Sequence, residues 1–159
     1  MWIDERGSEV LPLSECRRLL AVAANQHHHG HLGIPTADAP VVLPLDFGVH
    51  GSDVVLQVGE GLFDRMRGHL VAFQVDNSTT GPAWSDVDDE GRWSVLVRGP
   101  ATEVDPGAVG HGLPEPRVAE PGHRVVEVRA DVVTGRRGIS KAQAKKLAEF
   151  FHVGAEMFI

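Results

Sequence analysis

The feature that most constrains the fold is a change in the spacing of apolar residues near residue 25. Before it, residues 13–24 (LSECRRLLAVAA) carry Leu19, Leu20 and Ala23 at helical spacing, with Ser14 placed to cap the helix. After it, apolar and polar residues alternate in short segments separated by Gly, Pro, Asp and Asn, which is the pattern of β-strands. The sequence therefore predicts one N-terminal helix followed by a chain built mainly of strands.

Six segments carry the β pattern. They are GHLGI (30–34), VVLPLDFGV (41–49), DVVLQVG (53–59), HLVAFQVD (69–76), RWSVLVRGPATEV (92–104) and HRVVEVRADVV (123–133). The short link HGS between the second and third segments predicts an antiparallel hairpin. Residues 60–68 are long enough for one or two helical turns, with Leu62, Phe63 and Met66 facing inward.

In the last of these segments, alternate residues from Val126 to Val132 fall on one face, as in a strand with one side in water. Residues 103–123 are so rich in Pro and Gly that we expect a surface loop, and residues 140–151 have the capping and apolar stripe of a C-terminal helix. This order predicts a mainly β protein, an antiparallel barrel with peripheral helices, rather than a doubly wound sheet. At 159 residues we expect one domain, residues 1–159.

Charge and apolar content exclude several classes of partner. The formal net charge is −7 and no Lys/Arg-rich run is present, so we expect neither a nucleic-acid nor an anionic-membrane partner. No apolar run reaches the roughly 20 residues that span a bilayer, and the first ten residues are acidic and polar, unlike a signal peptide. The single Cys16 cannot form an internal disulfide. We expect a cytoplasmic protein.

Four histidines stand close together in QHHHGHLG (26–33). If His27, His29 and His31 lay on one strand, their imidazoles would share a face and could bind a zinc ion with an open coordination position. However, Gly30 interrupts such a strand, and no carboxylate lies near in sequence to orient the imidazoles. We therefore favour a turn over residues 26–29 and a barrel strand from Gly30, with no metal site.

Several segments, taken in order, resemble the pyridoxamine 5'-phosphate oxidase-like family of flavin-binding split barrels. The resemblance is carried by LSECRRLL (13–20), GHLGI (30–34), PVVLPLDFGVHGSDVVLQ (40–57), GLFDRMRG (61–68), LVAFQVD (70–76), WSVLVRG (93–99) and VEVRADVVTGRR (126–137). It implies a six-stranded antiparallel split β-barrel with peripheral helices. It also implies a homodimer with two cofactor sites at the subunit interface, in which the usual cofactor is FMN and relatives use a deazaflavin, haem or none identified.

The resemblance also assigns roles to particular residues. Pro44, Leu45 and Asp46 match the strand whose backbone lies along the flavin ring, and Val58, Gly59 and Glu60 match the strand end that approaches the phosphate. Further cofactor contacts are implied for Arg65 and Arg67 on the following helix, for Trp93 and Ser94 at the cofactor edge, and for His31, which stands where relatives often carry Arg.

The phosphate region departs from the family pattern. Relatives commonly place a hydroxyl residue and a Lys or Arg there, which donate hydrogen bonds to the dianion. This chain has Val58, Leu62 and Phe63 at these positions, and Glu60 adds a negative charge. Arg65 or Arg67 could supply the missing charge from one turn further on.

Two functions follow from the resemblance. The first is an FMN-binding oxidoreductase acting on an unknown small substrate, in which the cofactor carries the chemistry and no general acid can be assigned. The second is a binding module on the same split barrel that holds another ligand, such as a deazaflavin or a haem bound through one of the histidines. The altered phosphate region favours the second.

Overall fold

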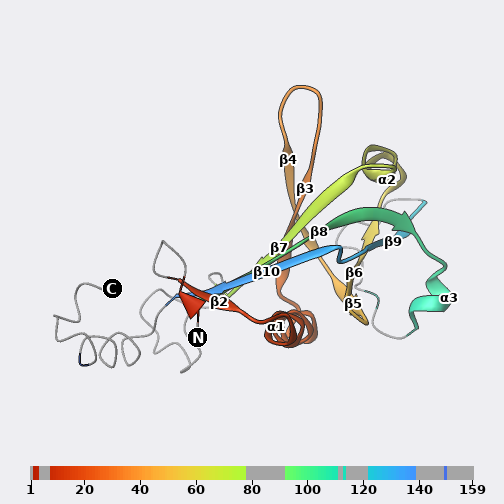
Figure 1. Cartoon of the computed structure of the whole chain (residues 1–159). Helices are drawn as coiled ribbons and strands as arrows, with labels where there is room; N and C mark the ends of the chain where they lie inside the picture. Colours follow the sequence, from red (N-terminus) through yellow and green to blue (C-terminus); the bar gives the residue numbers. More distant parts are fainter. Residues whose placement is uncertain are drawn as a thin grey trace.

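The computed structural model describes residues 2–3, 8–77, 92–110, 113, 122–138 and 149 (Figure 1). Within them lie ten strands and three helices. In chain order these are β1 (Trp2–Ile3), β2 (Glu9–Leu11), α1 (Leu13–Asn25), β3 (His29–Ile34), β4 (Val41–Asp46), β5 (Gly48–His50), β6 (Asp53–Val58), α2 (Glu60–Met66), β7 (Leu70–Asp76), β8 (Trp93–Glu103), α3 (Pro106–Val109), β9 (Arg124–Val128) and β10 (Val132–Arg137). None of these helices is long and apolar enough to span a membrane.

All pairs among the described strands are antiparallel. Strands β1-β2-β10-β8-β7-β3-β4 form what we call the main sheet, and β5, β6 and β9 form the side sheet. The long strand β8 joins them, because its first part pairs with β10 and its last residues, Ala101 to Glu103, pair with β9. The chain thus forms the predicted mainly β split barrel, with helices at the periphery (Figure 1).

The strand count exceeds the six expected because two predicted strands break where the barrel turns a corner. Residues 41–49 divide into β4 and β5 at Phe47, and residues 123–133 divide into β9 and β10 at residues 129–131. The second break leaves Val132 exposed, so the predicted alternation from Val126 to Val132 is wrong at its end. Strands β1 and β2, near the N-terminus, are the other two strands that were not predicted.

Gly99 permits the corner at which β8 changes partner. A Cβ atom built on this residue would lie 1.7 Å from the carbonyl oxygen of Arg129, which is backbone and cannot rotate away. The amide of Arg129 in turn donates a 3.1 Å hydrogen bond to the carbonyl of Pro100. Only glycine allows two main chains to approach this closely.

The core lies between α1 and the inner face of the strands. From α1 it includes Leu19, Leu20 and Ala23, as predicted, and the rings of Phe47 and Phe73 pack at 5.2 Å with a tilt of 59°. The helix begins differently from the prediction. Its N-cap is Pro12, whose carbonyl accepts the first two helical hydrogen bonds, and Ser14 lies inside the helix.

The other local predictions have mixed outcomes. The hairpin is confirmed, with Gly51 at φ +63° in the turn between β5 and β6, and α2 buries Phe63 and Met66. Within the predicted loop 103–123, however, β8 extends to Glu103 and α3 forms a short turn of helix. Asp105 caps α3 by accepting a hydrogen bond from the amide of Gly107. The predicted helix at 140–151 lies outside the described residues, apart from residue 149.

An ion-pair network fastens α1 to the main sheet. Glu15 accepts hydrogen bonds from Arg18 at 2.9 Å and from Arg137 of β10 at 2.7 Å. The hydrogen bond from Arg18, together with that from Arg137, lowers the pKa of Glu15 from 4.5 to about 2. A carboxylate whose pKa falls on folding stabilises the native state above its unfolded pKa and loses this effect as pH falls toward its folded pKa.

We therefore expect Glu15→Gln to lower the free energy of unfolding by about 1–2 kcal/mol at pH 7, since it removes a charge-assisted contact to a half-buried Arg137. The difference from the unmodified chain should shrink below pH 4.5 and vanish near pH 2. Urea unfolding across this range measures it. Asp38→Asn, an exposed acid in the β3–β4 hairpin, is the matched control and should change stability by less than about 0.5 kcal/mol. A Glu15→Gln deficit that stays constant down to pH 2 would contradict the linkage.

Candidate functional site

The outer face of the main sheet, which points away from the core, is ordered into three cross-strand rows. The strand register defines them, because residues opposite one another on neighbouring strands point to the same side. The apolar row is Val42, Gly33, Ala72, Arg98 and Val132; the middle row is Pro44, His31, Gln74, Leu96 and Thr134; the polar row is Asp46, His29, Asp76, Ser94 and Arg136. The face therefore combines side chains from five strands.

Part of the predicted ring-side group lies on this face. His31 and Pro44 face each other in the middle row, and Asp46 and Ser94 belong to the polar row. Leu45 and Trp93 do not join them: Leu45 packs against the core, and Trp93 is only 7% exposed. Among the described strands, β4 pairs with β3 alone, so its other edge is open, which explains how a strand can hold Pro44 in its middle.

His29 and Asp46 form a pair that the sequence did not reveal. The imidazole Nδ1 and the carboxylate Oδ1 lie 2.6 Å apart. No carboxylate is close in sequence to the histidine cluster, but the β3–β4 register places Asp46 directly opposite. Such a carboxylate fixes the orientation of the ring.

The three histidines of the metal alternative do not share a face. Strand β3 begins at His29, one residue earlier than predicted, while His27 lies in the turn before it with φ +55°. Gly30 does not interrupt the strand but lies buried within it, because a Cβ there would meet the ring of Phe73 at 2.1 Å. In the part of the chain that the structure describes, no three His, Cys, Asp or Glu side chains are placed to hold a metal ion.

The predicted phosphate-side group lies around α2. Val58 is buried at the end of β6, Gly59 precedes the helix, and Glu60 is exposed. Glu60 lies 3.2 Å from Arg124, which also bonds Glu103 at 2.8 Å. These hydrogen bonds, the one to Glu103 first, raise the pKa of Arg124. The positive charge of Arg124 is therefore already matched by two carboxylates.

Arg65 and Arg67 remain as exposed cations on and just after α2, and the guanidinium of Arg67 lies 5.7 Å from the ring centroid of Phe63. The predicted contacts at Trp93 and Ser94 are far from them. Leu70, which follows the α2 turn, pairs with the Pro100 end of β8, whereas Ser94 pairs with Asp76 six residues along β7. At about 3.3 Å per residue this separation is about 20 Å, so one chain does not bring the two groups together.

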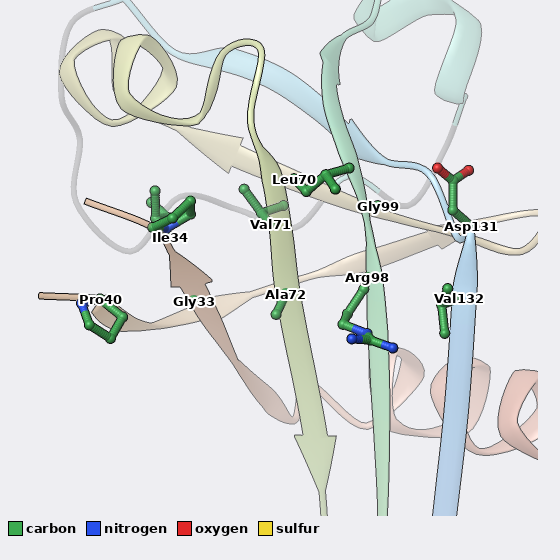
Figure 2. Close-up of a pocket in the computed structure, with 11 residues that line it drawn as sticks. Gly33, Ile34, Pro40, Leu70, Val71, Ala72, Arg98, Gly99, Asp131 and Val132 are labelled. Atoms are coloured by element: carbon green, nitrogen blue, oxygen red, sulfur yellow. The ribbon is translucent and has the colours of Figure 1, made fainter. Parts of the chain in front are cut away.

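An apolar pocket opens on the outer face, beside the α2–β7 turn (Figure 2). Its volume is about 640 Å³, within the range of small-molecule sites. It is lined by Gly33, Ile34, Pro35, Pro40, Leu70, Val71, Ala72, Arg98, Gly99, Asp131 and Val132. Sequence reasoning missed this pocket, although the alternation of β8 already placed Arg98 on the same face as Ser94.

A smaller pocket of about 320 Å³ lies at the other end of the face, where the polar row ends. It is lined by Ser8, Asp76, Asn77, Arg92, Trp93, Ser94, Arg136 and Gly138. The side chain of Asn77 holds the rim of this pocket in place, because Oδ1 of Asn77 accepts a 2.9 Å hydrogen bond from the backbone N–H of Trp93. The outer face thus carries an apolar pocket and a polar one.

Comparison with solved structures agrees with this architecture. The FAD binding protein from Mycobacterium smegmatis is 27% identical, with a TM-score of 0.60, and the match covers 81% of this chain and 98% of that one. An FAD-binding protein from Mesorhizobium loti is 21% identical, with a TM-score of 0.61 and coverage of 81% and 96%. A heme binding protein from Mycobacterium smegmatis is 16% identical, with a TM-score of 0.56 and coverage of 77% and 53%.

The protein from Mesorhizobium loti, at 21% identity, and the heme binding protein, at 16%, resemble this chain in fold alone. No curated protein matches the sequence. The family described as pyridoxamine 5'-phosphate oxidase matches residues 13–137, which include every strand from β3 to β10 and both α1 and α2. The chain belongs to the pyridoxamine 5'-phosphate oxidase family.

Proposed function

We propose that this chain is a flavin-binding redox protein that works as a homodimer on a small substrate. The observation that carries the proposal is the open edge of β4, which among the described strands pairs with β3 alone. An edge strand presents unpaired backbone N–H and C=O groups, which are the groups that bind the polar edge of a flavin ring. Family membership and the 27% identical FAD binding protein support the same cofactor class.

The residues of this chain fit the ring better than the phosphate. Alternate residues of an edge strand turn their backbone groups to its open side. On the side that Pro44 occupies, Asp46 can donate and accept through its backbone, while Pro44 offers a carbonyl only. At the phosphate side no hydroxyl stands at Val58, and Glu60, at the start of the helix that carries Arg65, adds a negative charge. A bound flavin supplies hydride or electron transfer. The protein would hold its ring at β4 and its phosphate through the two arginines.

Exposed apolar residues support a second copy over the outer face. Val42 is 61% exposed, Leu70 is 70% exposed and Val132 is 41% exposed. The strand register places all three on this face. Such a group on the surface of a small protein is typical of a protein–protein interface. A second copy would bring its own Ser94 end toward the region that one chain leaves about 20 Å away.

The flavin is tested by releasing the ligand from purified, denatured protein for absorbance and mass analysis, and by titrating cofactor-free protein with FMN, FAD and riboflavin. We expect flavin absorbance and binding. The Arg65→Gln, Arg67→Gln double variant should weaken FMN about tenfold and leave riboflavin, which has no phosphate, within about twofold. Arg17→Gln, on the exposed side of α1, is the control.

Colourless protein that ignores all three flavins would exclude the flavin function. A Soret band on addition of haem, lost in His31→Ala, would instead favour the haem-binding alternative, since His31 is exposed in the middle row. Equal loss of FMN and riboflavin in the double arginine variant would place the phosphate elsewhere.

A further inference from the structure

The apolar pocket contains one charge that nothing in the described structure neutralises. Two charged residues line it, Arg98 and Asp131. Asp131 is already engaged, because its Oδ1 lies 3.1 Å from Nε of Arg129. Across the described ranges, no carboxylate lies within ion-pair distance of Arg98, which is exposed on the outer face. A guanidinium is always charged and presents a planar fork of donors, so it is the group that recognises a carboxylate by two parallel hydrogen bonds.

The residues around Arg98 determine the shape and polarity of the ligand that the pocket can hold. In the apolar row it lies between Ala72 of β7 and Val132 of β10, as Figure 2 shows. Gly33 and Ala72 on one side carry almost no side chain, so the floor of the pocket is flat there. Pro35, Pro40 and Leu70 add apolar surface to the lining. A flat apolar group fits this floor.

We propose that this pocket binds a flat, mainly apolar monocarboxylate, with its carboxylate on Arg98 and its apolar part on Gly33 and Ala72. None of the residues that line the pocket is among those assigned to the flavin at β4 and α2, so this binding can be tested apart from the cofactor. A second copy over the outer face would cover the open side of the pocket and exclude water from the carboxylate–guanidinium pair, which strengthens it.

The test uses calorimetric titration of the full-length protein with 2-naphthoate and with uncharged 2-naphthamide, which has the same rings. We expect the naphthoate to bind at least tenfold more tightly. Arg98→Gln should abolish this preference, and Arg98→Lys should restore part of it, because an ammonium keeps the charge but not the bidentate geometry. Arg17→Gln should keep the full preference. Ala72→Leu, which fills the floor, should weaken both compounds alike.

Equal binding of the two compounds, no binding of either, or a preference that survives Arg98→Gln would overturn the proposal. A flavin titration of the same proteins separates it from the proposed cofactor. We expect FMN and naphthoate to bind together, so displacement of one by the other would show that the pocket is the flavin site and overturn the claim of a separate one. Protein that binds naphthoate but no flavin would leave this site standing and remove the flavin function.

Discussion

Gly99→Ala should lower the free energy of unfolding by at least about 3 kcal/mol, a large part of the roughly 5–15 kcal/mol that stabilises an ordinary domain. The added methyl group would sit 1.7 Å from the carbonyl oxygen and 2.8 Å from the carbonyl carbon of Arg129. Both are backbone atoms at the corner where β8 leaves β10 for β9, so no side chain can rotate to make room. The two sheets would have to separate. Urea unfolding followed by circular dichroism measures the change.

Gly61→Ala is the matched control for this variant. Nothing lies within 4 Å of a Cβ at Gly61, and the residue is inside α2, where alanine favours the helix over glycine. It should therefore be neutral or stabilise the protein by about 0.5 kcal/mol. If Gly99→Ala were tolerated as well as Gly61→Ala, the close approach of β8 to Arg129 would not exist in solution.

Leu70→Asp should convert the proposed dimer into a monomer. Leu70 is 70% exposed at the margin of the outer face, and an aspartate in its place would have to lose its hydration within an apolar interface. The cost of burying such a charge is large, and we expect the dissociation constant to rise at least about 100-fold. Size-exclusion chromatography with light scattering at micromolar concentration gives the mass before and after the change.

Leu13→Asp serves as the control for that experiment. Leu13 is also an exposed apolar residue, at 47%, but it lies at the start of α1, away from the outer face. This variant should remain a dimer. An unmodified chain that is already monomeric, or a dimer that Leu13→Asp disrupts and Leu70→Asp does not, would exclude the outer face as the interface.

Sequence patterns predicted correctly the features that depend on residues close together in the chain. The buried face of α1 follows from the spacing of Leu19, Leu20 and Ala23, and the β5–β6 hairpin follows from a two-residue turn at Gly51. The family order of the segments predicted the split barrel. The same reasoning failed at the corners, because a run such as residues 123–133 shows no break in composition at Asp131. The break depends on which partner strand each half meets.

The candidate site, too, could be predicted from the sequence only in part. Sequence patterns already assigned His31 and Asp46 to β-strands and predicted helices at residues 13–24 and 60–68. Only the tertiary structure decided that Asp46 faces His29, that Trp93 is buried and that Gly33, Ala72 and Arg98 meet in one pocket. These contacts join strands distant in sequence, and their register is set by burying the whole inner face at once, a cooperative requirement that no single segment contains.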